Sequence, residues 1–131
     1  MQGLRPKIRR VLTRFPDVKL CILFGSTALG KASDRSDVDI AVAGDKALDP
    51  DTCLELLEAL SVATGREIDL VDLTVSWGPI LAQALSKGIV IQNLDTTLYA
   101  GLISRMLFNQ ADMMPYYDRI LRERRERFLN G

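Results

Sequence analysis

Residues 20–42 read LCILFGSTALGKASDRSDVDIAV, and this stretch decides the fold that the sequence predicts. Residues 18–24 form a nearly unbroken apolar run, which is typical of a buried strand. Gly25 and Ser26 interrupt the run. After a polar loop, residues 37–42 alternate in polarity with the two-residue period of a strand. The stretch therefore predicts two strands connected through a glycine turn and a polar loop.

Further helices and strands are expected on either side, because apolar residues recur there with helical or strand periods. Asp51 or Thr52 is the candidate N-cap of a helix that Gly65 ends. The expected elements are helices over residues 3–15, 51–65 and 77–87, strands over residues 67–73 and 89–91, and a long helical region from Asp95 or Thr96. The helix over residues 77–87 is expected to turn Ile80, Leu81, Ala84 and Leu85 inward. Because helices alternate with short strands and no linker separates them, the sequence predicts one α/β or α+β domain over residues 1–131.

The composition excludes several classes of function. The chain carries 17 basic and 17 acidic residues, so no net charge draws it toward nucleic acid or an anionic membrane. No apolar run approaches the ~20 residues of a membrane span, and no signal-peptide core is evident, so we expect a cytoplasmic protein. Cys21 and Cys53 are expected as buried thiols rather than as a disulfide. Histidine is absent, which excludes a histidine base and leaves oxygen ligands, hence Mg²⁺ or Mn²⁺, for any metal.

Three aspartates are the candidate metal ligands. Asp37 and Asp39 lie two positions apart on a strand, so their side chains point to one face and repel each other. A divalent cation between them would relieve that repulsion. Asp69 lies between apolar neighbours in a later strand, where a charge is costly without a partner. We expect it to complete a three-carboxylate cluster if the two strands are adjacent, and we expect Asp72, of opposite parity, to face elsewhere or to lie at the strand end.

The Gly-Ser turn and the loop after it are candidates for phosphate binding. Gly25 allows the backbone to approach a ligand closely, and Ser26 offers a hydroxyl and an N–H group at an expected helix start. Lys31 is a candidate phosphate contact, with a solvated loop charge as the alternative. Ser36 belongs to the same candidate set, with a brace of the turn as the alternative.

The motif Gly25-Ser26, ten residues, Asp37-Val38-Asp39, followed by Asp69 in a later strand, resembles the signature of the DNA-polymerase-β-like nucleotidyltransferases. More narrowly, the chain resembles the small MNT-type proteins, minimal nucleotidyltransferases that act as antitoxins of HEPN-domain proteins. The resemblance covers most of the chain. It implies a nucleotidyltransferase fold, with a small, mixed or mostly antiparallel sheet of about four strands backed by helices.

The resemblance also implies an activity. Asp37 and Asp39 would bind two Mg²⁺ ions, and Asp69 would bind the metal nearest the nucleophile and help to deprotonate it. Gly25 and Ser26 would hold the β and γ phosphates of ATP. AMP would pass to a hydroxyl group, most readily that of a tyrosine, on a cognate HEPN ribonuclease toxin and so neutralise it.

Two other functions stay open at this point. One is an antitoxin that acts by binding alone, and the other is nucleotide transfer to a small molecule. The helical segment over residues 95–129 is a candidate docking surface for the toxin, with a solvated charged helix as the alternative. No membrane partner and no direct contact with nucleic acid are expected.

Overall fold

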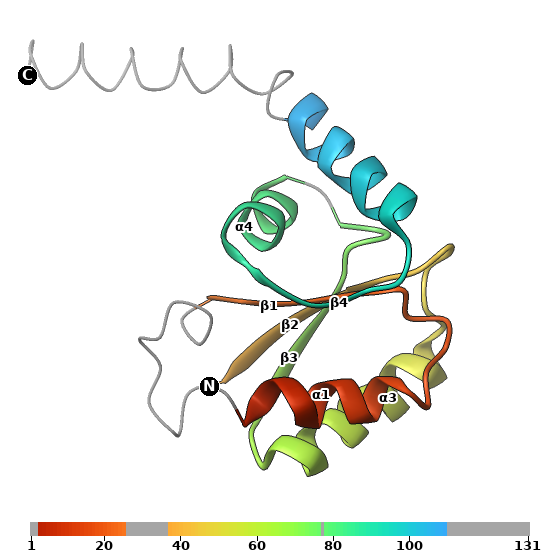
Figure 1. Ribbon diagram of the computed structural model, residues 1–131, viewed down its shortest axis with the longest axis vertical. Helices are drawn as coiled ribbons and strands as arrows, with labels where there is room; N and C mark the ends of the chain where they lie inside the picture. The colour runs from red at the N-terminus through yellow and green to blue at the C-terminus, as the bar shows by residue number, and fades with distance from the viewer. Residues whose placement is uncertain (1–2, 26–36, 77, 110–131) are drawn as a thin grey trace, which may run out of the picture.

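A single mixed sheet forms the middle layer of the protein (Figure 1). The computed structural model describes residues 3–25, 37–76 and 78–109. The strands are β1 (Leu20–Phe24), β2 (Val38–Ala43), β3 (Ile68–Asp72) and β4 (Ile89–Asn93), and their order across the sheet is β3-β2-β1-β4. Strand β1 is antiparallel to both of its neighbours, whereas β2 and β3 are parallel. The small mixed sheet predicted from the sequence is confirmed.

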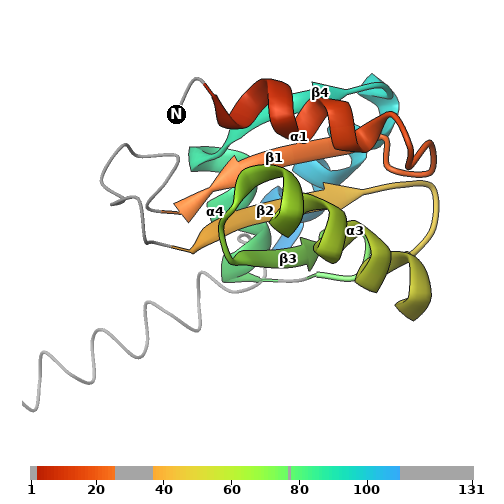
Figure 2. The same ribbon diagram turned by 90° about the horizontal axis from the view of Figure 1, so that it is seen from below.

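Helices cover both faces of the sheet (Figures 1 and 2). One face carries α1 (Leu4–Leu12) and α3 (Pro50–Thr64), whose buried residues include Ile8, Leu56 and Leu60. The other face carries α4 (Pro79–Lys87) and a helix over residues 96–109. Leu81, Ala84 and Leu102 pack there. Because helices lie on both faces, the central strands must be apolar on both faces, as the sequence of residues 20–24 is.

Alternate residues of β2 serve the two cores. Ile40 and Val42 pack with α1 and α3, whereas Ala41 and Ala43 pack on the α4 side. All four side chains are fully or nearly fully buried. Burying an isoleucine or valine side chain contributes about 1.5–3 kcal/mol, so Ile40 and Val42 hold β2 in its register, and the small alanines fit against the α4 side. Asp39 has the parity of Ala41, and the register therefore places its carboxylate on the α4 side.

The structure corrects the expected N-cap of α3 and the expected direction of the Ile80 side chain. Asp49, rather than Asp51 or Thr52, is the N-cap of α3, because its carboxylate accepts a hydrogen bond of 2.7 Å from the Thr52 N–H and Pro50 occupies the first turn. Ile80 does not face inward but is 41% exposed.

Cys53 is half-buried rather than buried, whereas Cys21 is buried, and both thiols are free. Burial raises the pKa of the Cys21 thiol to about 12, which makes it unreactive. Of the two candidate starts for the C-terminal helix, Asp95 is the cap, because it accepts a 3.0 Å hydrogen bond from the Leu98 N–H. None of the helices in the described ranges is both long and apolar enough to cross a membrane.

Candidate active site

Two carboxylates face each other across the parallel strands β2 and β3. Asp39 is the direct register partner of Asp69, and both have the parity that points to the α4 side of the sheet. Asp39 is half-buried, and Asp69 is exposed at the edge of the sheet. The adjacency of the two strands, on which the expected cluster depends, is therefore present in the structure.

The protonation of Asp39 responds to this arrangement. Burial raises the pKa of Asp39 above its usual value of 3.8, and the charge of Asp69, a hydrogen bond with the Asp69 carboxyl and the charge of Asp37 raise it further. Asp37 lies just before β2 and is exposed. The three aspartates are therefore close enough for two of them to penalise a negative charge on the third.

Gly25 brings the end of β1 against the same carboxylate. Its φ of +73° lies in the left-handed region that favours glycine. A Cβ atom at this position would collide with Oδ2 of Asp39 and would lie 3.0 Å from its Cγ. Phe24, the last residue of β1, is the register partner of Asp39. The glycine is therefore required twice, by its backbone conformation and by its contact with the acidic side chain.

The donor chemistry of this pair fits a divalent cation. Carboxylate oxygens are the ligands that Mg²⁺ prefers, and a cation shared by Asp39 and Asp69 would remove the repulsion that, after burial, raises the Asp39 pKa. Within residues 3–25, 37–76 and 78–109, however, no three Asp, Glu, Cys or His side chains already form a group that could hold a metal ion. The facing pair is thus the part of the predicted ligand set that the geometry supports, and the full set of three stays a prediction.

The comparison with protein families decides the classification. Residues 6–97 match the family described as "Polymerase beta, Nucleotidyltransferase", which is more than half of the chain. The chain belongs to this family. The family resemblance drawn from the sequence is therefore confirmed.

Known relatives of this nucleotidyltransferase include toxin–antitoxin proteins. It is 33% identical over 81 residues to the protein adenylyltransferase MntA of Shewanella oneidensis, an alignment that covers 62% of the chain and 58% of MntA. The chain thus spans less than two thirds of that relative. A crystal structure of a toxin–antitoxin with AMP-PNP superposes with a TM-score of 0.74 at 28% identity, covering 89% of this chain and 98% of the other.

A second similar structure contains an MNT antitoxin in complex with a tri-AMPylated HEPN toxin from Shewanella oneidensis. It superposes with a TM-score of 0.69 at 27% identity, covering 92% of this chain and 98% of the other. These likenesses confirm the nucleotidyltransferase fold and its similarity to MNT-type antitoxins.

The other predicted phosphate contacts, and the aspartate expected to lie away from the site, have different outcomes. Ser26, Lys31 and Ser36 lie outside the described residues, so their role in binding phosphate stays a prediction. Asp72 lies at the end of β3, as expected, and has a structural role there. Its two carboxylate oxygens accept hydrogen bonds of 2.9 Å from the backbone N–H groups of Leu48 and Thr74.

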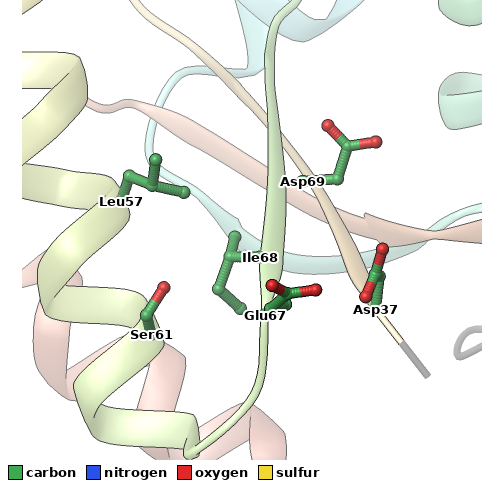
Figure 3. A pocket seen from close by; sticks show the side chains of 6 residues that line it. All are labelled: Asp37, Leu57, Ser61, Glu67, Ile68 and Asp69. Carbon is green, nitrogen blue, oxygen red and sulfur yellow. The ribbon is translucent and has the colours of Figure 1, made fainter. Parts of the chain in front are cut away.

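Glu67 is a residue near the site that the sequence analysis did not single out. It precedes β3, is exposed, and has the same parity as Asp69. Its carbonyl oxygen accepts a 2.9 Å hydrogen bond from the Val38 N–H, which anchors it beside β2. Figure 3 shows its carboxylate on the side of Asp37. The signal was present in the sequence, because Glu67 and Asp69 repeat the two-residue spacing of Asp37 and Asp39.

A hollow of about 450 Å³ opens beside these side chains. Leu57 and Ser61 of α3 form one wall together with Ile68 of β3, and the other lining residues are Asp37, Glu67 and Asp69. In Figure 3 the α3 side chains and the aspartates lie on opposite sides of β3. The hollow therefore follows the outer edge of the sheet next to the candidate catalytic pair.

Proposed function

We propose that this nucleotidyltransferase transfers AMP from ATP to a hydroxyl group, most readily that of a tyrosine, on a cognate HEPN-domain toxin and thereby neutralises it. The family match supports nucleotidyl transfer. The names of the relatives support the rest, since one is a protein adenylyltransferase and another is an antitoxin in complex with an AMPylated HEPN toxin. The two alternatives from the sequence, binding alone and a small-molecule acceptor, are outcomes of the experiment below.

The observation that carries the proposal is the facing pair of Asp39 and Asp69 with Gly25 packed against it. Asp37, Asp39 and Asp69 would hold Mg²⁺, with two ions expected. Bound there, Mg²⁺ would stabilise the charge that develops on the entering and leaving oxygens. Gly25, Ser26, Lys31 and Ser36 would hold the phosphates of ATP, so that the α-phosphate lies beside the carboxylates.

The chain's own groups position the reaction and remove one proton. The acceptor oxygen forms a bond to the α-phosphorus of ATP while the bond from that phosphorus to the bridging oxygen of the β-phosphate breaks, and pyrophosphate leaves. Asp69 is exposed at the edge of the sheet, where an acceptor can reach it, and takes the hydroxyl proton. Asp39 is half-buried and packs against Gly25, so its carboxylate is held in place as a ligand for Mg²⁺.

The test combines labelled ATP, Mg²⁺ and the product of the gene that neighbours this chain's gene, taken as the candidate HEPN-domain toxin. Label is expected on that protein with the wild-type chain and is expected to be absent with Asp39→Asn or Asp69→Asn. Asp72→Asn is the matched control, because this carboxylate lies on the same strand but accepts hydrogen bonds from the backbone N–H groups of Leu48 and Thr74. Undiminished transfer by the Asp39 variant would refute the assignment.

The same experiment separates the alternative functions. Tight binding of the toxin without label, unaffected by changes at Asp39 or Asp69, would show an antitoxin that acts by binding alone. Label on a small-molecule acceptor but not on protein would show the third function. A melting temperature that rises only when Mg²⁺ and ATP are both present would support the nucleotide site independently of any acceptor.

A further inference from the structure

Strand β3 leaves one of its edges open. It is the outermost strand in the order β3-β2-β1-β4, and among the described residues no strand pairs with its outer edge. The Glu67 carbonyl and the Leu73 N–H bond to β2, at 2.9 Å and 2.8 Å. Because ladder bonds to one neighbour come from alternate residues, the backbone N–H and carbonyl groups of Ile68 and Leu70 point away from β2. Such an edge is a template for a further extended segment.

The open edge adjoins the hollow described above. Ile68 lines that hollow together with Leu57 and Ser61 of α3, so a segment that lies along β3 would have an apolar wall on its α3 side. On the opposite side of β3 it would meet Asp69 (Figure 3). Side chains of an extended segment alternate between the two sides, so one of them can reach Asp69 while its neighbours contact the wall.

The charge along this edge selects the kind of segment. Glu67 and Asp69 line the hollow, and among the lining residues that the structure describes none is basic. An incoming segment with basic residues would be attracted, and an acidic one would be repelled. Salt screens this attraction beyond a short distance, so it acts only on charged residues of the segment that lie close to the edge.

We propose that the outer edge of β3 is the docking site for the acceptor, which binds as an added strand with a basic residue near the hydroxyl group that receives AMP. This inference rests on the proposed function and adds to it where the acceptor lies. Main-chain hydrogen bonds to Ile68 and Leu70 supply affinity, and Glu67 supplies the preference for basic neighbours. Glu67 is a specificity residue here and takes no part in the bond-making step.

The test uses a proline that removes one outward N–H group. Proline is tolerated on an edge strand when its missing N–H faces away from the ladder, so Leu70→Pro keeps the bonds to β2. Leu70→Ala is the matched control, because both variants lose the half-buried leucine side chain. With the same candidate toxin as acceptor, we expect KM for the acceptor to be about tenfold higher in Leu70→Pro than in Leu70→Ala. KM for ATP should be equal in the two.

A charge reversal provides a second variant that does not disturb the core. Glu67→Lys should raise KM for the acceptor by tenfold or more at low salt, with a smaller effect in Glu67→Gln and an unchanged KM for ATP. Equal acceptor KM values in the proline and alanine variants, or an effect of Glu67→Lys on ATP alone, would overturn the docking site.

Hydrogen exchange separates this inference from the proposed function. Adding the acceptor without ATP should slow exchange at the amides of Ile68 and Leu70, whether or not AMP is later transferred. Slow exchange without transfer would support docking and refute the catalytic proposal. Transfer with unchanged exchange at these amides would support catalysis and refute docking on this edge.

Discussion

Replacing Gly25 by alanine tests whether the end of β1 and the Asp39 carboxylate form one unit. The backbone at Gly25 has a φ of +73°, and an added Cβ would collide with Oδ2 of Asp39. Gly65, at the end of α3, offers a matched control. Its φ is +68°, and an added Cβ there would meet nothing within 4 Å. Both substitutions therefore place an alanine at a positive φ, and only the one at Gly25 adds a collision.

The magnitudes follow from these two contributions. An L-residue in the left-handed conformation costs about 1–2 kcal/mol, and this should be the whole effect of Gly65→Ala. In Gly25→Ala the collision adds about 1–3 kcal/mol of overpacking. Restoring normal separation between the new Cβ and the carboxylate requires a movement of about 1 Å, and a displacement of that size at reacting groups costs about a hundredfold in rate.

Urea denaturation and the AMP-transfer assay measure the two effects. We expect Gly65→Ala to lose stability but no activity, and Gly25→Ala to lose more stability and at least about a hundredfold in kcat. A double-mutant cycle with Asp39→Ala isolates the collision, because the double variant no longer contains the overlapping carboxylate. A coupling energy of about 1–3 kcal/mol is expected. Equal stabilities of the two alanine variants, together with full activity of Gly25→Ala, would refute the contact.

Three further predictions concern neighbouring side chains. Asp39→Asn should melt higher than wild type at neutral pH. The pKa of Asp39 is raised above 3.8 in the folded state, so its ionisation destabilises the wild-type fold. This destabilisation is absent below pH 3.8, grows as the pH rises towards the folded pKa, and is constant above it. The difference in melting temperature between Asp39→Asn and the wild type should follow the same course across an acid-to-neutral series. Asp72→Ala should lose about 2 kcal/mol, because two backbone N–H groups lose their acceptor, while the folded variant still transfers AMP; an inactive but stable variant would reverse these roles. Arg105→Ala should lose about 2 kcal/mol in urea denaturation, because the guanidinium donates hydrogen bonds of 3.1 and 3.0 Å to two carbonyls of the loop after β3, and an unchanged midpoint would show that this loop needs no such support.

Periodicity made the middle of each element predictable. The apolar run that contains β1 reflects burial of both faces of the strand, and the alternation in β2 reflects the two-residue period of its side chains. The sequence placed both strands correctly to within a few residues. The same parity argument separated Asp69 from Asp72, whereas the register that pairs Asp69 with Asp39 comes from the structure. Such inferences succeed because the side-chain direction in a strand is fixed by position alone.

Details at the ends of elements were less predictable, because several residues there could serve equally well. Asp49, Asp51 and Thr52 can all cap a helix, and the choice fell on the residue whose backbone is extended before Pro50. Ile80 has helical spacing with the buried Leu81 and Ala84, yet it lies in the first turn of α4 and remains 41% exposed. These outcomes depend on how the end of each helix packs against the neighbouring elements, which the periodicity of the sequence does not encode.

The direction of the strands explains why this short chain can form such a site. Because β1 is antiparallel to β2, its carboxyl end with Gly25 lies at the amino end of β2, beside Asp39. Because β2 and β3 are parallel, the crossover through α3 returns the chain to the same end of the sheet, and Asp69 arrives opposite Asp39. A slip of one residue in β3 would turn Asp69 into the core beside α3, where its charge has no partner, so the packing that stabilises the sheet also keeps the two carboxylates together.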